Sequence, residues 1–172
     1  MTFDLSQDER SVVVSRWYER IVGRYPAETA RFLKEQRDPF ANPVGAALRE
    51  ELSPLVDGLL DGCNLADLAP SLDRVVRIRA LQDMLPSQAV GFVLDLKELF
   101  GDVVTDDVSD VAKRDLDDRV DELLLVAFDV YNACRQQVFD IRVREIRNRS
   151  MKVMERLNAW REQRAGGPSS SA

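Results

Sequence analysis

The sequence has no histidine among its 172 residues. This absence excludes a histidine-containing catalytic triad, an HExxH zinc site and a histidine-ligated haem. It also removes the side chain that most often acts as a general base near neutral pH. The P-loop, GxGxxG and EF-hand patterns are missing as well. We therefore expect no enzymatic activity, no bound metal and no cofactor.

Long apolar runs are also missing, since no stretch of about 18 apolar residues could form a transmembrane helix. The first residues lack the basic and apolar regions of a signal peptide. The two cysteines, Cys63 and Cys134, do not have the spacing of a metal site. We expect both to be buried free thiols in a reducing compartment. These features predict a cytoplasmic protein without a membrane-inserted segment.

Helical patterns fill the chain, and no stretch predicts a β-strand. Ser6 and Glu9 have the spacing of a capping box at the start of the first helix. A second helix, Ala27 to Gln36, is expected to bury Ala30, Phe32 and Leu33. The turn after it is expected to insert Phe40 between helices. Further helices are expected to open at Pro43, Pro70 and Pro86. The predicted class is all-α, with six or seven helices.

The final third of the chain, residues 110–164, contains neither proline nor glycine and is predicted to be helical throughout. Apolar residues recur three or four positions apart along it, in two series that lie on roughly opposite sides at about 100° per residue. The first series consists of Val120, Leu124, Ala127, Tyr131, Cys134, Val138 and Ile141. The second series consists of Phe139, Val143, Ile146, Ser150, Val153, Leu157 and Trp160.

A helix of this length would span about 80 Å, whereas the rest of the chain, packed as one domain, should measure about 35–40 Å across. The helix must either extend beyond its domain or break near residues 147–150, and we predict extension. The predicted parts are a helical sensor domain at 1–145, a continuing helix with a dimer or partner seam at 146–164, and a disordered tail at 165–172. The predicted interface residues are Val143, Ile146, Val153, Leu157 and Trp160.

Charge is unevenly distributed. Residues 142–164 hold eight Arg or Lys against three Glu, and this net charge of +5 leaves −11 on the rest of a chain whose total is −6. A basic helix could contact nucleic acid or a membrane surface. However, no aromatic side chains alternate with the basic ones for base stacking, and the charges flank an apolar series as they do in coiled coils. We therefore expect a protein partner and not nucleic acid.

Arg79 falls within the apolar face of the predicted helix Leu72–Met84, where an unpaired charge would be costly. One interpretation is an internal ion pair with Asp83 or with a neighbouring helix. The other is a small pocket in which planar guanidinium donors bind a carboxylate or a phosphate. Arg135, beside Tyr131 on the long helix, is the expected second member of such a site. The candidate ligand-binding residues are Arg79, Arg135 and Tyr131.

Several segments, taken in order, resemble a known family. They are Trp17-Tyr18, Arg24-Tyr25-Pro26, the turn from Asp38 to Gly45, the arginine-rich run from Leu72 to Ala80, Pro86-Ser87-Gln88-Ala89, Ala127 to Tyr131, and Cys134-Arg135. Together they are similar to the N-terminal (RsbRD-type) domain of RsbT co-antagonist proteins, a stressosome-like sensor family of bacterial stress signalling. The resemblance covers roughly Glu9 to Arg149.

This resemblance implies a globin-like input domain that dimerises and passes a signal along its terminal helix. The lack of histidine agrees with a globin-like domain that holds no haem. Regulators of this family carry a phosphorylatable STAS domain after the helix, where this sequence ends in small and polar residues. No kinase or phosphoacceptor position is therefore carried over.

The primary hypothesis is a non-catalytic, cytoplasmic sensory or regulatory domain. Its expected fold is all-α, a globin-like or irregular helical bundle with a long C-terminal helix extending from it. It would form a homodimer through that helix and its neighbours and act with a protein partner in a regulatory complex. The alternative is a small-anion-binding module that uses Arg79 and Arg135.

Overall fold

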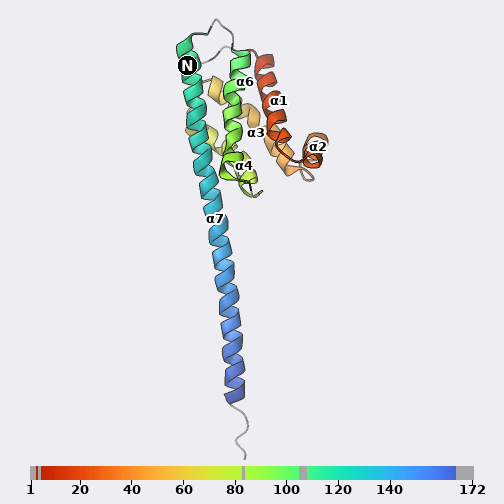
Figure 1. The fold of residues 1–172 in the computed structure, drawn as a ribbon, viewed down its shortest axis with the longest axis vertical. Helices are drawn as coiled ribbons and strands as arrows, with labels where there is room; N and C mark the ends of the chain where they lie inside the picture. Colours follow the sequence, from red (N-terminus) through yellow and green to blue (C-terminus); the bar gives the residue numbers. More distant parts are fainter. Residues whose placement is uncertain (1–2, 4, 83, 105–107, 166–172) are drawn as a thin grey trace, which may run out of the picture. The chain divides into compact units, whose positions relative to one another are not determined.

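The computed structural model describes residues 3, 5–82, 84–104 and 108–165, with side chains up to residue 162 (Figure 1). Its elements in chain order are α1 (Gln7–Gly23), α2 (Ala27–Glu35), α3 (Pro43–Leu60), α4 (Leu65–Ala80), α5 (Pro86–Val90), the 3-10 helix η1 (Gly91–Leu94), α6 (Asp95–Val103) and α7 (Asp110–Ala165). These described residues contain no strand. The predicted all-α class with a long C-terminal helix is confirmed, and the globin-like arrangement stays a prediction.

The chain divides into two compact units, Met1–Cys134 and Arg135–Ala172. The first unit contains α1 to α6 and the first part of α7, gathered around one hydrophobic cluster. The described part of the second unit is the remainder of α7. The division predicted between residues 145 and 146 stays a prediction. So does the tail at 165–172, nearly all of which lies outside the described residues.

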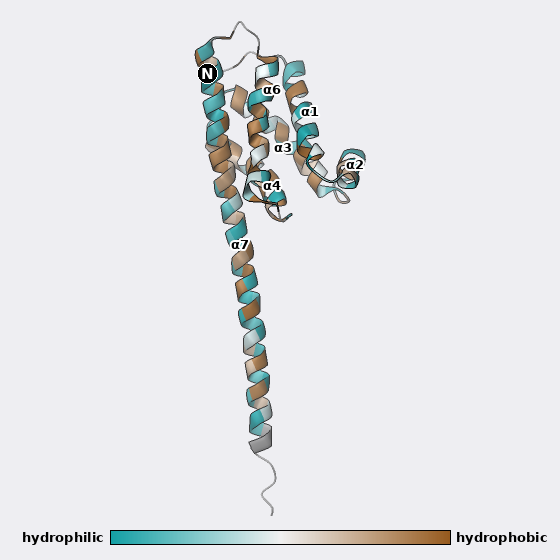
Figure 2. Ribbon diagram, in the orientation of Figure 1, coloured by the Kyte–Doolittle hydropathy of each residue, from teal (hydrophilic) through white to brown (hydrophobic). Residues whose placement is uncertain are grey.

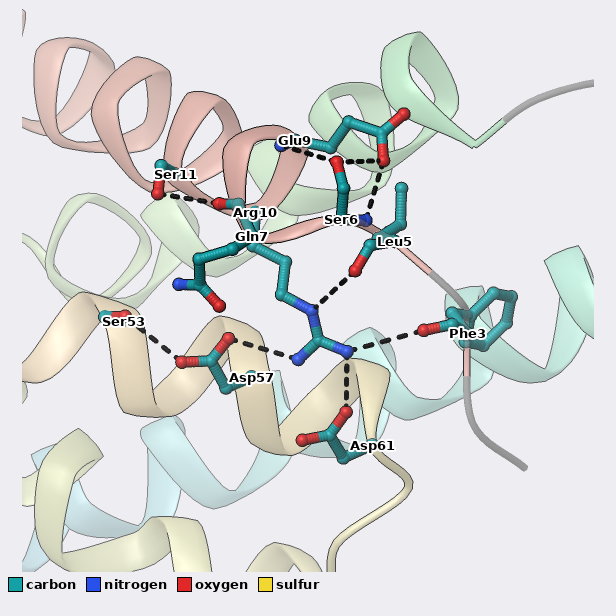
Figure 3. Close-up of polar contacts among 10 residues, drawn as sticks. All are labelled: Phe3, Leu5, Ser6, Gln7, Glu9, Arg10, Ser11, Ser53, Asp57 and Asp61. Carbon is teal, nitrogen blue, oxygen red and sulfur yellow. Dashed lines mark hydrogen bonds and ion pairs between the residues drawn. The ribbon is translucent and has the colours of Figure 1, made fainter.

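The predicted capping box forms at the start of α1 (Figure 3). The backbone nitrogen of Glu9 donates to Ser6 Oγ at 3.3 Å, and Glu9 Oε2 accepts from the backbone nitrogen of Ser6 at 2.8 Å. These reciprocal bonds satisfy two amide groups at the helix start, where amides lack intrahelical acceptors. The bonds from Ser6 also lower the pKa of the Glu9 carboxyl.

Arg10 fastens the start of α1 to the end of α3 (Figure 3). Its Nη1 lies 3.2 Å from Asp57 Oδ1, and its Nη2 lies 2.7 Å from Asp61 Oδ1. The same guanidinium donates to two backbone carbonyls ahead of α1, those of Leu5 at 3.2 Å and Phe3 at 3.4 Å. One side chain thus joins the chain before α1 to α3.

The centre of the core contains Trp17 of α1, which is fully buried. Its ring stacks on Phe92 of η1 with 5.6 Å between ring centroids. The Nε1 of Trp17 donates to the backbone carbonyl of Phe92 at 2.8 Å. Because an indole has one N–H donor, this bond satisfies the polar atom that burial would otherwise leave unpaired.

The part of α7 in the first unit contributes an apolar stripe to this core. Its buried residues are Ala112, Leu116, Val120, Leu123, Ala127, Tyr131 and Cys134. The prediction placed Leu124 in the stripe, but Leu124 lies about 70° from the centre of this stripe at about 100° per residue. Leu123 is therefore fully buried and Leu124 only partly. Val138 is only partly buried and Ile141, predicted to continue the stripe, is 55% exposed, so Cys134 is the last buried residue of the stripe.

The turn between α2 and α3 is closed by Asn42, whose side chain is almost fully buried. Its Oδ1 accepts from the backbone nitrogen of Gly45 at 2.8 Å. Its Nδ2 donates to the carbonyls of Leu33 at 3.1 Å and Gln36 at 2.9 Å. Because these polar bonds hold the turn, it needs no apolar plug. The prediction that Phe40 fills a gap between helices is wrong, since this side chain is 96% exposed.

Three other local predictions are wrong. Phe32 is 48% exposed because its neighbour Leu33 takes the inward position of α2, 100° away around the helix. Cys63 is exposed in the connection between α3 and α4. The helix α4 begins before Pro70, because Asn64 Oδ1 accepts from a backbone amide in its first turn at 2.9 Å and caps it there.

We expect Asn42→Ala to lower the free energy of unfolding by about 2 kcal/mol, because it removes a buried cap together with two hydrogen bonds to the carbonyls of Leu33 and Gln36. Asn64→Ala removes an exposed cap and should cost about 1 kcal/mol or less. Urea unfolding followed by circular dichroism measures both losses. Equal losses would contradict the special role given to the buried amide.

Candidate functional site

Arg79 is a buried cation on the apolar face of α4, with 1% of its surface exposed. Its Nε donates to the carbonyl of Ala89 at 3.0 Å, and its Nη2 donates to the carbonyl of Gln88 at 2.9 Å. Both carbonyls belong to the short helix α5, near its C-terminal end, where carbonyl groups lack intrahelical partners. The guanidinium therefore caps α5 from a neighbouring helix.

Two aromatic rings also surround the Arg79 guanidinium. Its Cζ lies 5.1 Å from the ring centroid of Phe92 and 5.8 Å from that of Tyr25, within the range of cation–π attraction. Its Nη1 donates to the Tyr25 hydroxyl at 3.4 Å. Burial lowers the pKa of Arg79 and raises the pKa of Tyr25. Asp83, the predicted ion-pair partner, lies outside the described residues.

A cleft of about 520 Å³ adjoins this guanidinium. Its lining residues are Arg24, Arg79, Met84, Ser87, Gln88 and Gly91. Arg24 Nη2 lies 2.6 Å from Asp95 Oδ1, while the other oxygen of that carboxylate is buried and has no hydrogen bond within the described part of the chain. Burial raises the pKa of Asp95, and the positive charge of Arg24 opposes that rise. Two guanidinium groups at one cleft suit a carboxylate or phosphate ligand.

The structure places the other two predicted ligand residues differently. Tyr131 is 4% exposed, and its hydroxyl donates to the carbonyl of Met84, a cleft residue, at 3.2 Å. Arg135 is exposed and belongs to the second unit, so its pairing with Arg79 stays a prediction. Arg24 was not singled out from the sequence as a site residue. The available signal was its place in one of the segments that carry the family resemblance.

The predicted interface residues of α7 are all accessible. Apolar residues recur among hydrophilic ones along this helix (Figure 2). The exposed fractions are Val143 37%, Ile146 64%, Val153 55%, Leu157 47% and Trp160 52%. That these residues form an interface stays a prediction.

Comparison with known proteins supports the resemblance found in the sequence. The family described as "RsbT co-antagonist protein rsbRD N-terminal domain" matches residues 11–146. A protein of Archaeoglobus fulgidus, described as an uncharacterized protein, is 25% identical over 154 residues, which cover 87% of this chain and 91% of that protein. No solved structure matches the chain significantly. Within the described residues, no helix combines the length and apolar character needed to cross a membrane.

We expect Arg79→Met to lower the free energy of unfolding by about 3 kcal/mol, because it removes the side-chain donor to two α5 carbonyls and one bond to the Tyr25 hydroxyl, which still donates to Gln82. Arg16→Met is the matched control. It removes an exposed ion pair with Asp102 and should cost no more than about 1 kcal/mol. Thermal and urea unfolding measure both. A loss at Arg79 as small as that at Arg16 would contradict its role as the cap of α5.

Proposed function

We infer that this chain, which belongs to the family of RsbT co-antagonist protein rsbRD N-terminal domains, is a non-catalytic sensory or regulatory domain. The family is one of stressosome-related regulators. We propose in addition that the chain acts in the cytoplasm within a regulatory complex, forms a homodimer and signals to a protein partner through its C-terminal helix.

The observation that carries this proposal is the change of burial along α7. Up to Cys134 the helix buries a residue at every third or fourth position, whereas from Val143 to Trp160 the apolar residues at similar spacing are exposed. No proline or glycine interrupts α7. A change in how the buried stripe packs would therefore act on the same helix that carries the exposed residues. An exposed apolar series of this kind is typical of a contact with another chain.

The proposed homodimer needs a surface on the first unit, because three heptads with Ser150 at the centre form only a marginal coil by themselves. Exposed apolar residues are available there. Leu125 and Phe128 of α7 are 65% and 43% exposed, and Leu81, directly after α4, is 63% exposed. We propose that these residues contribute to the contact between the two copies.

We expect the full chain and a chain that stops at Arg142 both to have the mass of a dimer in sedimentation experiments. Replacing Leu125 and Phe128 together by Glu should give monomers at both lengths, because carboxylates would have to be buried between the copies. Val12→Glu is the control, at an α1 residue that is 43% exposed, like Phe128. It should leave the mass unchanged. A monomer at both lengths without any substitution would rule out the homodimer.

A second candidate function is the binding of a small anion in the cleft beside Arg79. The observation that favours it is the pair of guanidinium groups, from Arg24 and Arg79, among the cleft residues. Three nitrogens of Arg79 already donate to protein acceptors. Arg24 is the more adaptable cation, because its side chain is 39% exposed and could exchange Asp95 for a ligand.

Titrating inorganic phosphate and small carboxylates against the chain tests this second function by thermal shift. A ligand at a hundredfold excess over its Kd should stabilise the chain by about 2.7 kcal/mol. Arg24→Gln should remove the shift, and Arg16→Gln, at an exposed ion pair of α1 away from the cleft residues, should not. If no anion shifts the melting temperature, the anion-binding module is excluded for these probes and the regulatory function remains.

A further inference from the structure

The exposed apolar residues of α7 have the register of a coiled coil. We use the term α7 seam for Phe139, Val143, Ile146, Ser150, Val153, Leu157 and Trp160, all of them exposed. Their spacing alternates between four and three, which puts four of them at heptad position d and three at position a. At about 100° per residue the stripe is about 100° wide, as in a coiled coil.

The positions on both sides of the α7 seam are dominated by arginine. Heptad positions e and g between residues 139 and 162 hold Asp140, Arg142, Arg147, Arg149, Met154, Arg156 and Arg161. The acidic residues after Asp140 are elsewhere, because Glu145, Glu155 and Glu162 occupy positions c and f. Within the described part of the chain, none of these five arginines forms an ion pair.

A second copy of the α7 seam is a poor match for this arrangement. In a parallel pair, position g faces position e of the next heptad in the other helix, which sets Arg142 against Arg147 and Arg156 against Arg161. An antiparallel pair sets e against e and g against g, and the g positions Arg142, Arg149 and Arg156 are all arginines. Like charges placed opposite each other disfavour a complex. The arginines beside the seam therefore disfavour pairing of two α7 seams, whether parallel or antiparallel.

We propose that the α7 seam binds an amphipathic helix of a different protein, one that carries Asp or Glu on both sides of its own apolar stripe. This inference rests on the proposed function and gives the chemistry of its partner. Carboxylates at the partner's e and g positions would pair with the arginines, and its a and d residues would cover the apolar residues. The segment from Phe139 to Trp160 offers about 33 Å of helix for this contact. Nucleic acid would meet the arginines but leave the apolar residues in water.

Two synthetic helical peptides of three heptads are suitable probes. Both carry Leu and Ile at positions a and d, while one has Glu and the other Lys at every e and g position. Calorimetric titration should show that the full chain binds the acidic peptide. Its affinity for the basic peptide should be lower by roughly tenfold or more. At about 1 M salt, where the Debye length is about 3 Å, the difference should shrink.

A charge-reversed chain makes the test specific. Replacing Arg142, Arg147, Arg149, Arg156 and Arg161 by Glu should make the chain prefer the basic peptide. All five side chains are exposed, so the fold of the first unit should be retained, which far-ultraviolet circular dichroism checks. The control is the double substitution Arg144→Glu and Lys152→Glu, at positions b and c. It changes the net charge but not the residues beside the seam. This control should still prefer the acidic peptide.

Equal binding of the two peptides would overturn this inference, and so would a charge-reversed chain that keeps the preference of the original. Failure of the acidic peptide while anionic vesicles or duplex DNA bind would also overturn it. The result of this peptide test can be distinguished from the result of the homodimer test. If the chain stopped at Arg142 is dimeric and the full chain ignores the acidic peptide, the partner chemistry is wrong and the dimer stands. If the acidic peptide binds and both lengths are monomeric, the partner chemistry stands alone.

Discussion

Burial of the Arg79 charge is the constraint on which the first unit depends. A guanidinium removed from water must be given acceptors, and here they come from elements far apart in the chain: the carbonyls of α5, the Tyr25 hydroxyl after α1, and the ring faces of Tyr25 and Phe92. Phe92 in turn stacks on Trp17 and accepts its indole N–H. The polar and apolar parts of the core are thus continuous, because the ring that shields the cation also fills the centre of the hydrophobic cluster.

The sequence was informative where one element determines its own structure. The capping box at Ser6, the all-α class and the long terminal helix follow from local spacing, and the family resemblance follows from short segments in order. The errors occur where contacts between elements decide. Phe40 is exposed because Asn42, not an apolar side chain, closes its turn. Arg24 joins Arg79 at the cleft only through the packing of helices, which no spacing in the sequence expresses.

The two parts of α7 obey different physical rules. In the first unit the helix is selected for packing, and small and large apolar residues alternate with acidic ones that remain in water. In the second unit the apolar residues are exposed and the neighbouring charges are positive. Such sorting of charge around an apolar stripe favours one class of contact over others, which is how coiled coils choose partners. Specificity of this kind suits a domain whose role is regulatory, because it lets a helix with few heptads distinguish between chains.

The two cysteines lie on opposite sides of the boundary between core and solvent. Cys63 is exposed, whereas Cys134 is buried as the last residue of the α7 stripe. An alkylating reagent can therefore reach the first thiol in the folded chain and the second only after that end of the stripe has left the core. In a Cys63→Ser variant, the alkylation rate of Cys134 therefore measures how often the end of the first unit opens. Cys134 is thus a chemical reporter at the position where the proposed signal would pass.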